Sequence, residues 1–107
     1  MKLVIAIVKS DDSHNVMSEL TKAGFYATKL STTGGFLRAG NSTILVGVED
    51  EKTKEVIEII KEYSSERTEL LQPFFPLQGS EIMAPMVNVS VGGATIFVLD
   101  VEQFYKV

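Results

Sequence analysis

The residues best suited to binding chemistry lie in one glycine-rich segment, residues 28–41, which reads TKLSTTGGFLRAGN. Its glycines allow backbone N–H groups to face an anion, its hydroxyls are hydrogen-bond donors, and Lys29 and Arg38 are positively charged. Phe36 adds an aromatic ring that can stack on a base. The same residues also suit an ordinary hairpin loop with Phe36 in the core, and on the residues alone this second interpretation is the more economical one. No Gly-Lys-Ser/Thr stretch precedes a helix here, so the segment is not a Walker A loop.

Two further glycines, Gly92 and Gly93, separate the apolar stretches 87–91 and 94–99. Residues 87–91 alternate with the period of a strand, and a Gly-Gly pair is typical of the two-residue turn of a β-hairpin. Turn formation by itself explains both glycines.

The sequence contains no recognisable catalytic or metal centre. Cysteine is absent, and the single histidine, His14, has no second histidine or serine–carboxylate pair at a suitable spacing. Acidic residues such as Asp11 and Asp12 are interpreted as helix caps and part of a solvated helix face, because no bend glycine accompanies them in an oxygen-ligand loop. We therefore predict a protein that is not an enzyme, with no catalytic residue, metal or cofactor.

The chemistry-bearing segments are positioned by alternating strands and helices. Residues 3–8 are continuously apolar and predict a buried strand. From Asp12, a suitable N-cap, apolar residues recur at helical spacing up to Gly24, which suits the left-handed position after a helix. A second, amphipathic helix is predicted to begin at Asp50. The other predicted strands are 25–30, 42–48, 67–71, 87–91 and 94–99, and a long loop is predicted at 72–85.

This order of elements predicts an α+β fold, a ferredoxin-like sandwich with two helices on one face of an antiparallel sheet, followed by a C-terminal β-hairpin. The runs 3–8 and 96–99 are apolar on both sides of their strands. Two helices cannot cover both faces of such a sheet, so we expect the chain to form an oligomer.

Length and composition restrict the class of protein further. With 107 residues, 45% of them hydrophobic and 22% charged, the chain is expected to form a single domain, residues 1–107. The net charge of −4 argues against non-specific binding of nucleic acid. No apolar stretch approaches the roughly 20 residues of a membrane-spanning helix, and the lack of cysteine suits the reducing cytoplasm.

The chain resembles the PII-like cyclic di-AMP receptor proteins of Gram-positive bacteria. The matching motifs are residues 28–30, 32–41 and 91–99, and the resemblance is weak only from about residue 72 to residue 86. It implies a PII-like homotrimer with three clefts between subunits, each binding one cyclic di-AMP. It also implies two mobile loops, here 31–41 and 72–85, that report occupancy to an unidentified downstream protein.

The ligand contacts that the resemblance implies combine polar, aromatic and glycine positions. Hydroxyl and amide side chains can bond base edges or phosphate, an aromatic and a leucine side chain can sandwich adenine, and glycines admit the backbone close to the ligand. The expected residues are Tyr26, Thr28, Gly35, Phe36, Leu37, Arg38, Asn41, Gly47, Gly92 and Gly93.

The chain departs from the family pattern at two positions. Family members commonly have Asn and Arg where this chain has Gly24 and Tyr26. Tyr26 cannot reproduce the charge-assisted contact of an arginine, although its ring can stack. A signal-transduction receptor for cyclic di-AMP is the function expected, and a trimeric interaction or scaffold protein with lost or altered nucleotide binding is the alternative.

Overall fold

The computed structural model describes residues 1–30, 40–71 and 86–107. In chain order its elements are β1 (Lys2–Lys9), α1 (Ser10–Lys22), β2 (Ala27–Leu30), β3 (Asn41–Val48), a 3-10 turn η1 (Asp50–Lys52), α2 (Thr53–Ser64), β4 (Arg67–Leu71), β5 (Val87–Val91) and β6 (Ala94–Asp100).

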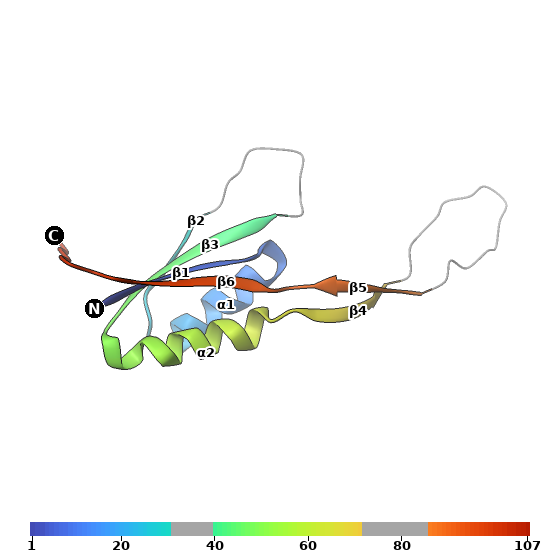
Figure 1. Ribbon diagram of the computed structural model, residues 1–107, viewed down its shortest axis with the longest axis horizontal. Coiled ribbons are helices and arrows are strands. Elements are labelled where there is room, and N and C mark those ends of the chain that lie inside the picture. Colours follow the sequence, from blue (N-terminus) through green and yellow to red (C-terminus); the bar gives the residue numbers. More distant parts are fainter. Residues whose placement is uncertain (31–39, 72–85) are drawn as a thin grey trace.

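Strands β2, β3, β1 and β6 form one antiparallel sheet, in that order across the sheet. Helices α1 and α2 both lie on one side of this sheet (Figure 1). This arrangement is the strand order of a ferredoxin-like βαββαβ sandwich. The predicted α+β fold, with two helices on an antiparallel sheet, is confirmed.

The fourth strand of the sandwich is β6, not the strand predicted at 67–71. Strand β6 pairs along β1, whereas β4 pairs with β5 in a separate two-stranded ribbon (Figure 1). The ribbon is thus an insertion between α2 and the last strand of the sandwich. Both β4 and β6 have strand-like sequences, so the choice between them depends on which strand can pair with the outer edge of β1.

The predicted C-terminal hairpin between 87–91 and 94–99 is wrong. Although only Gly92 and Gly93 separate β5 from β6, the two strands pair with different partners and run nearly in line (Figure 1). Both glycines have positive φ, 82° and 98°. The Gly-Gly pair therefore carries the chain from the ribbon into the main sheet instead of reversing it, and β5 and β6 each gain a full-length partner.

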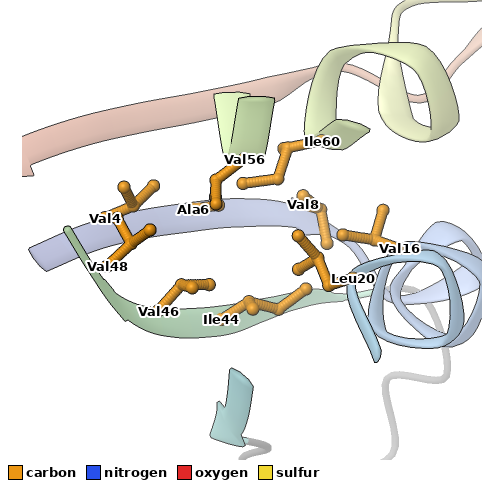
Figure 2. Packing of buried hydrophobic residues seen from close by; sticks show 10 residues of the cluster. All are labelled: Val4, Ala6, Val8, Val16, Leu20, Ile44, Val46, Val48, Val56 and Ile60. Atoms are coloured by element: carbon orange, nitrogen blue, oxygen red, sulfur yellow. The ribbon is translucent and has the colours of Figure 1, made fainter. Parts of the chain in front are cut away.

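The hydrophobic core lies between the helices and the covered face of the sheet (Figure 2). Strands β1 and β3 direct every second side chain into it, as the two-residue period of a strand requires, and each helix contributes its apolar stripe. The buried side chains are Val4, Ala6, Val8, Val16, Leu20, Ile44, Val46, Val48, Val56 and Ile60.

The opposite face of the main sheet is apolar, and none of the described helices covers it. Ile5, Leu45 and Phe97 are aligned across β1, β3 and β6 in one row of this open face. Phe97 is 50% exposed and Leu99, in the next row, is 48% exposed. The sequence analysis expected such a surplus of apolar surface, and the structure places it on this face.

Helix α1 ends where it was predicted to end. Gly24 has a φ of +90°, its N–H donates to the Thr21 carbonyl at 3.0 Å, and the Phe25 N–H donates to the Leu20 carbonyl at 2.9 Å. This pair of bonds is the Schellman motif, which favours glycine at the position of Gly24.

The start of α1 differs from the prediction. The helix begins at Ser10, and Asp12 is not its cap but a buried residue of the first turn, 4% exposed. Asp12 is buried because its side chain forms an ion pair with a distant residue, described below. Within the described residues, neither helix has the length and apolarity needed to cross a membrane.

Candidate functional site

A cleft of about 540 Å³ lies between the first turn of α1 and the β4–β5 ribbon. One wall comes from the end of β1, the start of α1 and the start of β3, and the other from the ribbon. The cleft is large enough for a small-molecule ligand. Its lining residues are Lys9, Ser10, Asp11, Asp12, Asn15, Gly40, Asn41, Arg67, Glu69, Ser90, Val91 and Gly92.

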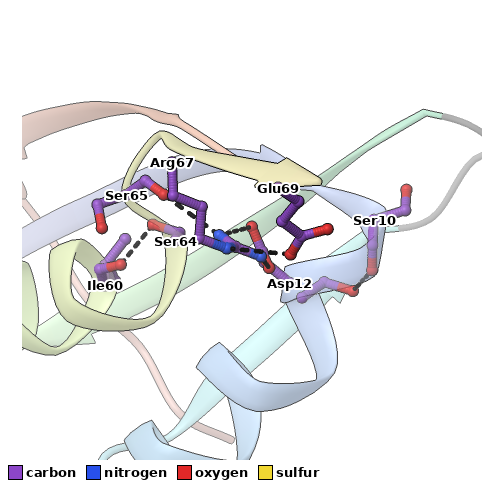
Figure 3. A network of polar contacts seen from close by, with 8 residues as sticks. Ser10, Asp12, Ile60, Ser64, Ser65, Arg67 and Glu69 are labelled. Carbon is purple, nitrogen blue, oxygen red and sulfur yellow. Dashed lines mark hydrogen bonds and ion pairs between the residues drawn. The ribbon is translucent and has the colours of Figure 1, made fainter. Parts of the chain in front are cut away.

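An ion pair between Asp12 and Arg67 joins the two walls (Figure 3). The Arg67 guanidinium donates to both carboxylate oxygens of Asp12, at 2.7 and 3.2 Å. It also donates to the Ser65 carbonyl at 3.2 Å and lies 3.6 Å from the Glu69 carboxylate. The hydrogen bond that Arg67 donates to Asp12 is the main reason that the pKa of Arg67 lies above its ordinary value.

Gly92 lies directly beside this ion pair, at a position where a side chain does not fit. A Cβ at this position would lie 2.6 Å from Nη1 of Arg67 and 2.6 Å from the Ser65 carbonyl oxygen. Its φ of +82° also disfavours any L side chain. The neighbouring Gly93 donates its N–H to the Ser64 carbonyl at 2.6 Å, which ties the ribbon-to-sheet junction to the end of α2.

The first turn of α1 is tied to the start of β3 as well. The Ser10 N–H donates to the Gly40 carbonyl at 2.8 Å, and the hydroxyls of Ser10 and Ser42 lie 3.4 Å apart. The Ser13 hydroxyl donates to the Ser10 carbonyl at 2.8 Å. Backbone and side-chain bonds therefore hold the wall that carries Asn41.

The described lining of the cleft is not positively charged. Its carboxylates, on Asp11, Asp12 and Glu69, outnumber its cations, on Lys9 and Arg67. Two of these carboxylates already face Arg67. This part of the cleft is therefore better suited to uncharged polar groups, such as base edges and sugar hydroxyls, than to phosphates.

A second hollow, of about 330 Å³, lies at the other end of β3 and is lined by Gly24, Tyr26 and Gly47 among others. Tyr26 is 89% exposed. The ammonium group of Lys106 lies 5.7 Å from the centroid of the Tyr26 ring, within the range of a cation–π contact. The C-terminal segment after β6 therefore reaches the chain that leads into β2.

The structure brings the predicted ligand residues together only in part. Asn41 and Gly92 line the first cleft, and Tyr26 and Gly47 line the second hollow. Thr28 is exposed on β2 opposite Leu45, on the open face of the sheet. Gly93 lies at the ribbon junction, and the remaining predicted contacts lie outside the described residues: Gly35, Phe36, Leu37 and Arg38.

Sequence reasoning missed the ion pair at the centre of the cleft. Asp12 and Arg67 are 55 residues apart, and neither lies in a motif that marks it as special. Ser90 and Glu69 were missed for the same reason, since they enter the cleft only because β4 and β5 pair with each other. Among residues 1–30, 40–71 and 86–107, no group of three or more metal-ligating side chains is present.

The fold and the cleft together define a small α+β sandwich with a ligand-sized polar cleft at one end of its sheet. The family model for the cyclic-di-AMP receptor matches residues 1–107, and the chain belongs to this family. The resemblance inferred from the sequence motifs is thus confirmed.

A solved structure supports the fold. The crystal structure of a functionally unknown protein from Pediococcus pentosaceus ATCC 25745 is 43% identical in sequence to this chain. The match covers 99% of this chain and 96% of that protein, with a TM-score of 0.79. The α+β architecture therefore extends to a protein whose fold is known by experiment.

Proposed function

We propose that this protein is a PII-like signal-transduction receptor that binds cyclic di-AMP in clefts between the subunits of a homotrimer. Binding changes the conformation of the loops 31–41 and 72–85 and so alters a surface for a downstream protein. The observation that carries this proposal is the match of the cyclic-di-AMP receptor family over the whole chain.

The placement of the predicted contacts favours a site between subunits. The side chains of Thr28 and Asn41 and the backbone of Gly47 are exposed on the open face along the β2–β3 edge, and Tyr26, which is exposed, directly precedes β2. Asn41 and Gly47 are about 20 Å apart along one strand, at ~3.3 Å per residue. One chain alone leaves this stripe uncovered, whereas a second copy packed on the open face turns it into one wall of a cleft.

Gly47 supports the same conclusion. Its φ lies outside the left-handed region, and no atom of the described residues lies within 4 Å of a Cβ built on it. The fold of the single chain therefore does not require glycine there. A ligand or a neighbouring subunit that approaches the backbone closely does require glycine at position 47.

We propose further that the protein binds its ligand without converting it, as a receptor role implies. The buried carboxylate of the cleft, Asp12, is engaged by Arg67 and is not free to act as a general base. Incubation with cyclic di-AMP, followed by chromatography, should yield no linear dinucleotide. Formation of the linear product in proportion to protein concentration would make the protein an enzyme.

Titration calorimetry against a nucleotide panel tests the binding proposal. We expect cyclic di-AMP to bind at one molecule per chain. Cyclic di-GMP should bind at least about tenfold more weakly, because a pocket that pairs with adenine edges leaves polar groups unpaired against guanine. AMP and ATP should also bind at least about tenfold more weakly, because each offers one adenine where cyclic di-AMP offers two. Absence of a heat signal for cyclic di-AMP, together with an intact trimer, would favour the scaffold alternative.

A further inference from the structure

The two walls of the cleft belong to parts of the chain with different stability. The wall formed by α1 and β3 is continuous with the buried core. The other wall is the β4–β5 ribbon, and an isolated two-stranded ribbon is only marginally stable in water. Leu70 on β4 is 63% exposed and Val87 on β5 is 40% exposed, so the described chain gives the ribbon little apolar packing. The position of the ribbon relative to α1 must therefore depend on a few specific contacts.

Within the described residues, the side-chain hydrogen bonds between the two walls are those of Asp12 with Arg67. The Asp12 side chain is 6% exposed and that of Arg67 is 43% exposed. A buried carboxylate is stable only when it is paired, and the planar guanidinium fork restricts both the distance and the orientation of its partner. This pair therefore constrains the ribbon much more tightly than a surface ion pair would.

The backbone at Gly92 shows how closely the ribbon packs against this ion pair. The last residue pair of the ribbon, Arg67 opposite Val91, is followed directly by Gly92, whose backbone lies against both members of the ion pair. A Cβ there would also lie 3.3 Å from Oδ2 of Asp12. Strand β5, strand β4 and helix α1 thus meet at one point, where no additional atom fits.

We propose that Asp12 and Arg67 are positioning residues of the cleft between α1 and the β4–β5 ribbon: their ion pair docks the ribbon onto the first turn of α1 and sets the separation of the two walls of this cleft. Neither residue needs to touch the ligand for this role. Because Ser10 in the same turn also binds the Gly40 carbonyl, the turn holds both walls at once. The effect on ligand affinity rests on the proposed function, whereas the effect on the ribbon does not.

The first experiment is hydrogen exchange on the ligand-free protein with Asp12→Asn, Arg67→Gln and the double variant. We expect amides of β4 and β5 to exchange about tenfold faster in each, because hydrogen bonds to a charged group are lost, while amides of β1 and β3 keep their rates. The double variant should match the single ones, since either change removes the whole interaction. The control is Lys22→Gln, which breaks an exposed pair with Glu19 on the same helix and should change neither region.

Two results of this experiment would overturn the proposal. Unchanged exchange in the ribbon would show that the pair does not dock it. Equally faster exchange in β1 and β3 would show a general stabilising role with no specific link to the ribbon.

The second experiment measures cyclic di-AMP affinity in the same variants and in Arg67→Lys. We expect about tenfold weaker binding for Asp12→Asn and Arg67→Gln and a partial recovery for Arg67→Lys, which keeps the charge but not the bidentate fork. Faster ribbon exchange with unchanged affinity would overturn the part of the proposal that concerns the cleft. If the unmodified protein does not bind cyclic di-AMP, the proposed function fails, and the exchange experiment still decides whether the pair docks the ribbon.

Discussion

At the scale of single residues, Gly47 and Gly92 show that glycine is present for two different reasons. Gly92 is required by the chain itself, because of its positive φ and the atoms of Arg67 and Ser65 around it. Gly47 lies in a regular strand with open space around it. The described residues of the single chain do not require glycine there, which agrees with the proposed role of Gly47 beside a ligand or a second subunit.

This contrast predicts opposite outcomes for two alanine substitutions. Gly92→Ala should lower the free energy of unfolding by about 2 kcal/mol or more, because it adds backbone strain and a steric clash. Gly47→Ala should change it by less than about 0.5 kcal/mol and should instead weaken cyclic di-AMP binding. Chemical denaturation at one protein concentration and calorimetry provide the two measurements. Equal stability losses in the two variants would contradict the assignment.

Tyr26 allows a test of ligand recognition at the second hollow. Replacing Tyr26 with Arg should tighten cyclic di-AMP binding about tenfold, because one charge-assisted hydrogen bond to phosphate contributes ~1.4 kcal/mol or more. The control is Tyr105→Arg, which makes the same change of charge at another exposed tyrosine, 77% exposed. If both variants tighten binding equally, the effect comes from net charge, and if Tyr26→Arg weakens binding, the native ring itself contacts the ligand.

At the scale of secondary-structure elements, the ends of α1 determine what the helix positions. Its first turn carries Asp12 into the cleft, and its last turn ends in the Schellman motif at Gly24, next to the second hollow. One helix thus connects the two hollows of the chain.

The helix end predicts which substitutions at Gly24 are tolerated. Gly24→Asn, which restores the residue common in the family, should cost less than ~1 kcal/mol of folding free energy, since asparagine tolerates the left-handed conformation and no atom lies within 4 Å of the added Cβ. Gly24→Val should cost about 2 kcal/mol, because a β-branched residue does not tolerate positive φ. Thermal and urea denaturation of both variants measure the difference, and similar losses would argue against the motif.

At the scale of the whole molecule, the uncovered apolar face of the main sheet requires a partner. We expect light scattering at micromolar concentration to give about three times the chain mass of 11.7 kDa. Phe97→Glu, on the edge strand β6 of this face, should give monomers, because a carboxylate buried without a partner is costly. His14→Glu adds the same charge on the exposed side of α1 and should leave the assembly intact. A stable monomer of the unmodified chain would remove the basis for a site between subunits.

Several features of the fold could be predicted from sequence patterns alone, because they depend on neighbouring residues. The apolar run of β1, the apolar stripe with Val56 and Ile60 in α2, and the left-handed glycine after α1 are local preferences that the tertiary structure preserves. The surplus of apolar strand surface was also predictable, since two helices cover only one face of a sheet.

Only the tertiary structure decided which strands pair and which distant charges meet. The Gly92-Gly93 pair permits either a hairpin or a passage between sheets, and the available edges of β1 and β4 select the passage. Asp12 has the sequence environment of a helix cap, yet it is buried because the ribbon brings Arg67 to it from 55 positions along the chain. Local sequence sets backbone preference and periodicity, but strand pairing and burial of charge depend on contacts between segments that are far apart in the sequence, and these exist only once the whole chain has folded.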